Sequence, residues 1–110
     1  MKRLQMDITR DNDVDRKPAI ATEYCEEQLD KAIKYVEENS PKQAEIMRSQ
    51  FFKTLRQLEK TPWIGRPYKN GMRMIKLGKF RYNIYYREIE TKIEVLGIWH
   101  TSRGTEFEEQ

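Results

Sequence analysis

Apolar residues recur along the first half of the chain with the spacing of two amphipathic helices. Between residues 24 and 39 they fall three or four positions apart, which places them on one helical face. Thr22 precedes this stretch as a helix cap, and Ser40-Pro41 ends it and starts a second helix that runs to about residue 60. Because the linker is so short, the two helices are predicted to form an antiparallel hairpin. The apolar faces comprise Tyr24, Cys25, Leu29, Ala32, Ile33 and Val36, then Ala44, Met47, Phe51, Leu55 and Leu58.

The second half of the chain has the composition of β-strands. Residues 72–77, 80–87 and 93–99 are rich in β-branched, aromatic and methionine residues. A two-residue turn at Gly78-Lys79 and a tight turn at residues 88–92 would connect them into a meander. Residues 61–70 contain two prolines and one glycine and are predicted to be a loop, in which Trp63 contacts the helices.

The short apolar segment 17–22 completes the set of elements, and Pro18 near its start suits an edge strand. The sequence therefore predicts an α+β fold made of a short N-terminal strand, an α-helical hairpin and a three-stranded antiparallel β-meander. Residues 17–103 would form this domain. We expect residues 1–16 to be a flexible N-terminal extension and residues 104–110 to be an acidic C-terminal tail.

Alternation along residues 80–87 assigns side chains to the two faces of the predicted sheet. Phe80, Tyr82, Ile84 and Tyr86 would face the core. Tyr85 falls on the opposite face and is therefore expected to be the more exposed aromatic residue. The residues on that opposite face are Arg81, Asn83, Tyr85 and Arg87.

Charge is distributed unevenly along the 110 residues. Residues 61–103 hold nine Lys/Arg against three Glu, whereas residues 104–110 hold three Glu and no basic residue. A localised basic surface points to a polyanionic partner, either nucleic acid or an acidic protein segment, although a solvated basic face is the plain alternative. The single cysteine, Cys25, excludes an internal disulfide and a cysteine-based zinc cluster. No membrane span or secretory signal is evident, so we expect a cytoplasmic protein.

Two kinds of side chain could carry chemistry on this basic sheet. His100 is the one histidine of the chain and could act as a general acid or base, or could simply bond to backbone at a strand end. Basic residues from all three predicted strands could form a phosphate-binding surface, bind an acidic partner or face solvent. These are Arg73, Lys76, Arg81, Arg87 and Arg103.

The order of elements, together with the motifs GRPY, GMRMI, YNIYYR and IEVLGIWHTSR, resembles the RelE/ParE family of type II toxin–antitoxin toxins. The resemblance covers about residues 17–103. It implies a small sheet wrapped by a helical hairpin, growth inhibition as the activity, no cofactor and no metal, and a cognate antitoxin as partner.

The resemblance implies one of two targets, which are DNA gyrase for ParE-like members and the ribosome with mRNA for RelE-like ribonucleases. The ribonuclease branch often has Arg second in a Tyr-Arg-x-x-Tyr stretch, where this chain has Asn83. Asparagine lacks the charge and the forked donors with which arginine binds a phosphate, so the gyrase-directed branch is favoured. If the protein is a ribonuclease, His100, Arg73 and Arg81 are the expected catalytic residues. Nucleic-acid or partner binding is expected of Lys76, Tyr85, Arg87 and Arg103.

A third interpretation lies outside the toxins. The chain could be a plain binding module whose basic sheet recruits an acidic partner without inhibiting growth. The sequence does not decide among these functions.

Overall fold

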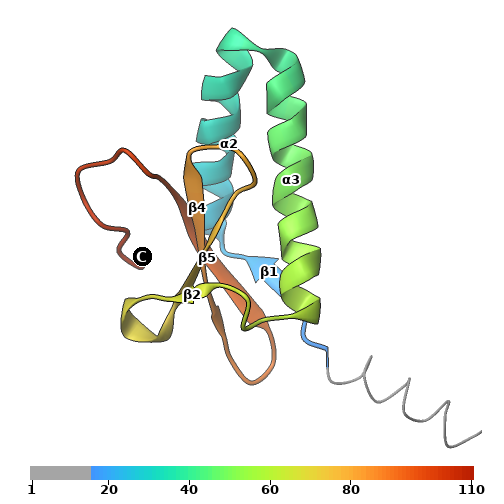
Figure 1. Cartoon of the computed structure of the whole chain (residues 1–110), viewed down its shortest axis with the longest axis vertical. Coiled ribbons are helices and arrows are strands. Elements are labelled where there is room, and N and C mark those ends of the chain that lie inside the picture. Colours follow the sequence, from blue (N-terminus) through green and yellow to red (C-terminus); the bar gives the residue numbers. More distant parts are fainter. Residues whose placement is uncertain (1–15) are drawn as a thin grey trace, which may run out of the picture.

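The computed structural model describes residues 16–110, so the predicted N-terminal extension lies outside the described residues except for Arg16. One sheet carries a helical hairpin on one face, and the tip of the hairpin extends past the sheet (Figure 1). A short 3-10 helix at Lys69–Gly71 connects two of the strands. The main elements are β1 (Ala19–Ala21), α2 (Glu23–Asn39), α3 (Pro41–Lys60), β2 (Arg66–Pro67), β3 (Arg73–Lys76), β4 (Tyr82–Glu88) and β5 (Ile93–His100).

The sheet has the strand order β1-β5-β4-β3-β2. β1 pairs with β5 in parallel, and the other neighbours are antiparallel, so the predicted α+β class, hairpin and meander are confirmed. The two-residue strand β2 pairs with β3 inside the segment predicted to be a loop. Its two backbone pairs are too few to leave a sequence pattern.

The predicted two-residue turn between β3 and β4 is wrong. The Leu77 N–H donates to the Tyr82 carbonyl over 2.9 Å, so four residues connect these two positions. Phe80 belongs to this turn rather than to the strand, because its N–H donates to the Leu77 carbonyl over 3.0 Å. Gly78 has φ 55°, a backbone conformation that glycine adopts without steric cost.

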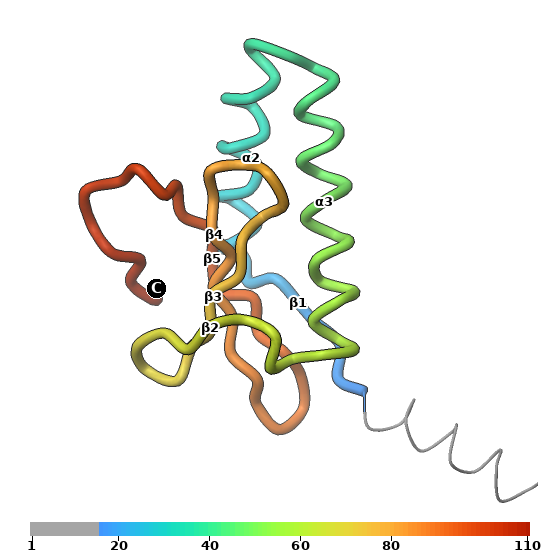
Figure 2. Tube along the Cα trace, viewed as in Figure 1, coloured from blue at the N-terminus to red at the C-terminus, as the bar shows by residue number. Residues whose placement is uncertain are grey.

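The helical hairpin is defined by two side-chain caps. The hydroxyl of Thr22 accepts from the Cys25 N–H over 3.1 Å, and the hydroxyl of Ser40 accepts from the Gln43 N–H over 3.1 Å. Ser40 ends α2 and caps α3, and Pro41 occupies the first position of α3, where the absence of an N–H costs nothing. The chain therefore reverses within one residue, and the two helices run side by side along their length (Figure 2).

The main core lies between the hairpin and the sheet. α2 packs against β5, and α3 packs against α2 and β1. The predicted alternation along β4 holds, because Ile84 and Tyr86 are fully buried in this core while Phe80 and Tyr82 pack at its margin. Its largest fully buried members are Tyr86, Phe51, Met47, Leu58, Leu77, Ile84 and Ile93. No helix in the part from residue 16 onward is long and apolar enough to cross a bilayer.

A second, smaller cluster covers the opposite face of the sheet. A β-bulge helps to form it: Tyr85 lies opposite Gly97 and Tyr86 opposite Val95, which leaves Leu96 as an extra residue on β5. Leu96 therefore joins the second cluster while Val95 belongs to the main core. The buried members of the second cluster are Met72, Tyr85, Leu96 and Phe107, with Tyr24, Tyr68, Met74 and Trp99 partly buried around them.

Candidate partner-binding surfaces

The C-terminal segment folds back over this second face and is anchored by Phe107. The Phe107 side chain is fully buried, and its ring stacks on Tyr85 with centroids 4.5 Å apart and planes 9° apart. Two hydrogen bonds fix the backbone of the segment: the Tyr68 hydroxyl donates to the Phe107 carbonyl over 3.1 Å, and Trp99 Nε1–H donates to the Thr105 carbonyl over 2.9 Å. The segment is thus a third layer on the sheet, and Figure 1 shows it on the side away from α3.

Acidic side chains on either side of Phe107 pair with two cations of the sheet. Lys69 Nζ lies 2.9 Å from a Glu106 carboxylate oxygen and 2.5 Å from one of Glu108. Arg87 donates to both oxygens of Glu109 over 3.0 and 2.6 Å. The hydrogen bond from Lys69 lowers the pKa of the Glu106 carboxyl below its usual value. In turn, the hydrogen bonds to Glu106 and Glu108 raise the pKa of Lys69. The tail therefore neutralises part of the basic surface that the sequence indicates.

The expectation that Tyr85 is exposed is wrong, since only 5% of its surface is accessible. Alternation gives the correct face for Tyr85, but Phe107 covers that face. Arg87 pairs with Glu109 and also lies 3.4 Å from a Glu94 carboxylate oxygen, so its charge is already neutralised within the chain. The one sequence signal for this arrangement is a phenylalanine set among the three glutamates of the tail.

Arg73 holds a loop rather than facing a partner. Its Nη1 donates to the Gly65 carbonyl over 2.8 Å and to the Trp63 carbonyl over 3.3 Å. Tyr86 reinforces this link from the core, because its hydroxyl donates to the Pro62 carbonyl over 2.8 Å and accepts from the Gly65 N–H over 2.9 Å. The Trp63 side chain is 65% exposed, so at most a small part of it can pack against the helices as predicted. Hydrogen bonds from Arg73 and Tyr86 to the backbone hold the loop instead.

Lys76 and Arg81 remain accessible. Both are exposed, and within residues 16–110 neither forms an ion pair. Asn83 lies between Lys76 on β3 and Trp99 on β5 in the pairing register, so it shares the second face of the sheet with them. This part of the face lies at the far end of the strands from the Arg87 pairing with Glu109.

His100 ends β5 on the helix side of the sheet, opposite Tyr82. Its Nδ1 accepts from the Ser102 N–H over 3.0 Å, so in the neutral ring the proton lies on Nε2. The ring meets Tyr82 edge-on, with centroids 4.9 Å apart. Arg73 pairs with Tyr86, four residues further along β4, which is about 13 Å at ~3.3 Å per residue. The structure therefore does not bring His100 and Arg73 together.

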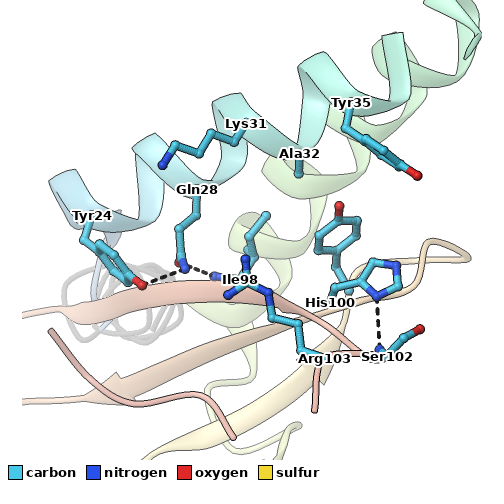
Figure 3. A pocket seen from close by; sticks show the side chains of 10 residues that line it. Tyr24, Gln28, Lys31, Ala32, Tyr35, Ile98, His100, Ser102 and Arg103 are labelled. Atoms are coloured by element: carbon cyan, nitrogen blue, oxygen red, sulfur yellow. Dashed lines mark hydrogen bonds between the residues drawn. The ribbon is translucent and has the colours of Figure 1, made fainter. Parts of the chain in front are cut away.

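A cleft of about 610 Å³ opens between α2 and the turn that follows β5. We call it the aromatic–cationic cleft. Figure 3 shows the α2 side chains on one wall and His100, Ser102 and Arg103 on the other. Its ten lining residues include no aspartate or glutamate. The aromatic, imidazole and charged side chains in it are Tyr24, Lys31, Tyr35, Tyr82, His100 and Arg103.

Sequence reasoning identified His100 and Arg103 but missed the α2 wall of this cleft. The predicted apolar face includes Tyr24 but neither Lys31 nor Tyr35. A signal was present, because positions 24, 28, 31 and 35 recur at helical spacing and so form a second stripe beside the apolar one.

Nucleophilic and metal chemistry find little support in the described residues. Burial, and then the negative charge of Glu26, raise the pKa of the Cys25 thiol to about 12. The reactive thiolate is therefore scarce near neutral pH. Within residues 16–110, no group of three His, Cys, Asp or Glu side chains is placed to hold a metal ion.

Comparison with known proteins fits this architecture. A search of curated protein sequences finds no match. The solved structure of the chromosomal ParDE TA system from P. aeruginosa contains a chain with the same fold, at a TM-score of 0.70 and 20% sequence identity. The match covers 79% of this chain and 98% of the other. Residues 20–104 match the family described as the ParE toxin of type II toxin-antitoxin system, parDE. The chain therefore belongs to the ParE toxin family of type II toxin–antitoxin systems.

Proposed function

We propose that this ParE-family toxin inhibits growth by acting on DNA gyrase, and that it does so in the cytoplasm. The observation that carries the proposal is the family match over residues 20–104, because gyrase is the target that the ParE branch implies. The neutral Asn83, which stands where the ribonuclease branch often has arginine, agrees with it.

A metal-free ribonuclease needs a base for the 2′-hydroxyl and a cation for the developing phosphate charge in one place. His100 and Arg73 lie about 13 Å apart along the strands, and Arg73 already donates to two backbone carbonyls. Asn83 adds no charge between Lys76 and Trp99. The predicted pair of His100 and Arg73 is therefore not assembled, and Asn83 supplies no charge in place of an arginine. Other cations lie closer to His100, since Arg103 shares its cleft and the Arg81 carbonyl accepts from the Thr101 N–H. The gyrase proposal thus rests on the family match.

We further propose that a cognate antitoxin neutralises the toxin through an acidic segment. Lys76, Arg81 and Arg103 are exposed, and none of the three has an ion-pair partner in the described part of the chain. The C-terminal tail shows that basic residues of this sheet can bind carboxylates, since Lys69 and Arg87 both pair with its glutamates. Co-expression with the adjacent gene should yield a complex that weakens as salt rises.

The target is tested with purified toxin in two parallel assays. In a supercoiling assay, the toxin should inhibit gyrase and accumulate cleaved DNA, whereas mRNA on programmed ribosomes should remain intact. Cleaved mRNA together with unaffected gyrase would refute the proposal and support the ribonuclease alternative. Inactivity in both assays, from a folded toxin that also fails to slow growth, would instead indicate a plain binding module.

Charge-removal variants connect the activity to the surface. Lys76→Gln combined with Arg81→Gln should weaken gyrase inhibition about tenfold, on the order of 1.4 kcal/mol, if these cations contact an acidic partner surface. Lys42→Gln combined with Lys53→Gln removes the same charge from exposed positions on α3 and is the matched control. Equal effects of the two pairs would mean that net charge, rather than this surface, drives inhibition.

A further inference from the structure

We propose that the aromatic–cationic cleft is a nucleotide-binding site, in which cationic and hydroxyl groups hold the phosphate and a tyrosine stacks on the base. The inference goes beyond gyrase inhibition and does not depend on it, because binding is measured on the isolated toxin.

The cleft is rich in hydrogen-bond donors and has no carboxylate. Arg103 is positioned by stacking, with its guanidinium carbon 3.9 Å from the Trp99 ring centroid, and within residues 16–110 it has no acidic partner. Stacking uses the face of the guanidinium and leaves its N–H edge available, which is the geometry that binds two oxygens of a phosphate. Lys31 adds a second cation from α2, across the cleft.

Two neutral donors complete this set. His100 Nδ1 is occupied by the Ser102 N–H, so a neutral ring offers Nε2–H. The Tyr24 hydroxyl accepts from Gln28 Nε2 over 2.9 Å, which leaves its own proton free to donate. A cleft lined by these donors and by no acidic group favours an anion with several hydrogen-bond acceptors. A nucleotide phosphate is such an anion, because its ionised oxygens accept hydrogen bonds.

The walls of the cleft favour a planar group beside that anion. Tyr35 is 64% exposed at one end, and Tyr82 meets the His100 ring edge-on inside. An exposed tyrosine offers a free ring face for stacking, and base–aromatic stacking contributes about 1–3 kcal/mol per base. The volume of about 610 Å³ falls in the range of small-ligand sites, ~300–1,000 Å³, and suits one nucleotide.

Calorimetric titration of the toxin with adenosine monophosphate, adenosine and inorganic phosphate tests each part of the site. We expect the nucleotide to bind more tightly than phosphate alone, and phosphate alone more tightly than the nucleoside. Arg103→Gln and Lys31→Gln should each weaken nucleotide binding about tenfold or more. Tyr35→Ala should weaken the nucleotide about fivefold or more and leave inorganic phosphate unchanged. Lys53→Gln, an exposed cation on α3 outside the cleft, is the control and should have no effect.

Three results would overturn the proposal. These are no heat of binding at about 10 mM nucleotide, equal affinity for nucleoside and nucleotide, or equal affinity of the cleft variants and Lys53→Gln. If phosphate binds as tightly as the nucleotide and Tyr35→Ala changes nothing, the base-stacking part is wrong and the nucleotide assignment fails. A toxin that inhibits gyrase but binds no nucleotide refutes this inference alone, so the two proposals fail separately.

Discussion

Replacing Phe107 with alanine removes the side chain that anchors the C-terminal segment to the sheet. Phe107 is fully buried against Tyr85 and meets Trp99 edge-on at 5.7 Å. Glu106 and Glu108 are largely exposed, with 74% and 65% of their side chains accessible, whereas Glu109 is 32% accessible. Because solvent screens exposed pairs and each is worth little, we expect them not to hold the segment in place once the ring is gone.

The expected magnitude follows from the burial of the ring. Transfer of a phenylalanine side chain out of water stabilises by about 1.5–3 kcal/mol, and the stacked pair with Tyr85 adds about 0.5–1.5 kcal/mol. Once the segment is released, the variant can lose no more stability than the free energy with which the segment docks on the sheet. We therefore expect Phe107→Ala to lower the free energy of unfolding by about 3 kcal/mol. In a domain of this size the melting temperature should fall by on the order of 15 °C.

Urea denaturation of three variants tests this reasoning. Phe107→Ala and a truncation that removes residues 104–110 should lose nearly the same stability, because both release the segment. Phe52→Ala is the matched control, since that ring is 48% exposed on α3 and its loss should cost less than about 1 kcal/mol. If Phe107→Ala is no worse than Phe52→Ala, or if the truncation costs much more than Phe107→Ala, the ring is not the anchor.

Three further predictions concern single groups. Tyr86→Phe leaves the Pro62 carbonyl and the Gly65 N–H without their partner and should cost about 1–3 kcal/mol in urea denaturation, whereas Tyr85→Phe should be close to neutral. The burial that raises the pKa of Cys25 to about 12 should make its alkylation at pH 8 slow in the native protein and fast in urea, and fast native alkylation would contradict this. The lowered pKa of Glu106 means that its contribution to tail docking is present above the ordinary carboxyl pKa and lost as pH falls through the folded value. In a Trp63→Phe background, Trp99 fluorescence should therefore change on acidification, and the change should vanish when residues 104–110 are removed.

Sequence reasoning succeeded where local patterns determine the structure. The apolar spacing of α2 and α3, the caps at Thr22 and Ser40, and the alternation along β4 are all properties of residues close in sequence. Each of them fixes a helix end or the face of a strand without knowledge of distant contacts. The helical hairpin, the meander and the core-facing side chains could therefore be predicted.

The candidate site was harder to predict, because distant segments decide it. Tyr85 is buried by Phe107, which is 22 positions later in the chain, and no periodicity connects the two residues. Leu96 reaches the second face through a bulge, which a count of alternating positions cannot detect. The aromatic–cationic cleft forms where α2 packs against the end of β5. The sequence pattern of α2 is dominated by its apolar face, so it does not reveal which α2 residues line the cleft.

The tail also changes where a partner can bind. The basic excess of residues 61–103 suggests one continuous surface, but Lys69 and Arg87 are paired with glutamates of the tail. The accessible basic residues of this segment lie mainly toward the other end of the strands. Lys76 ends β3, Arg81 is in the turn before β4, and Arg103 borders the cleft. An acidic partner that binds there would leave the tail in place, whereas one that binds at Lys69 would have to displace Phe107. Salt should then weaken both modes of binding, but only the second should be strengthened by Phe107→Ala, because the variant has already released the segment.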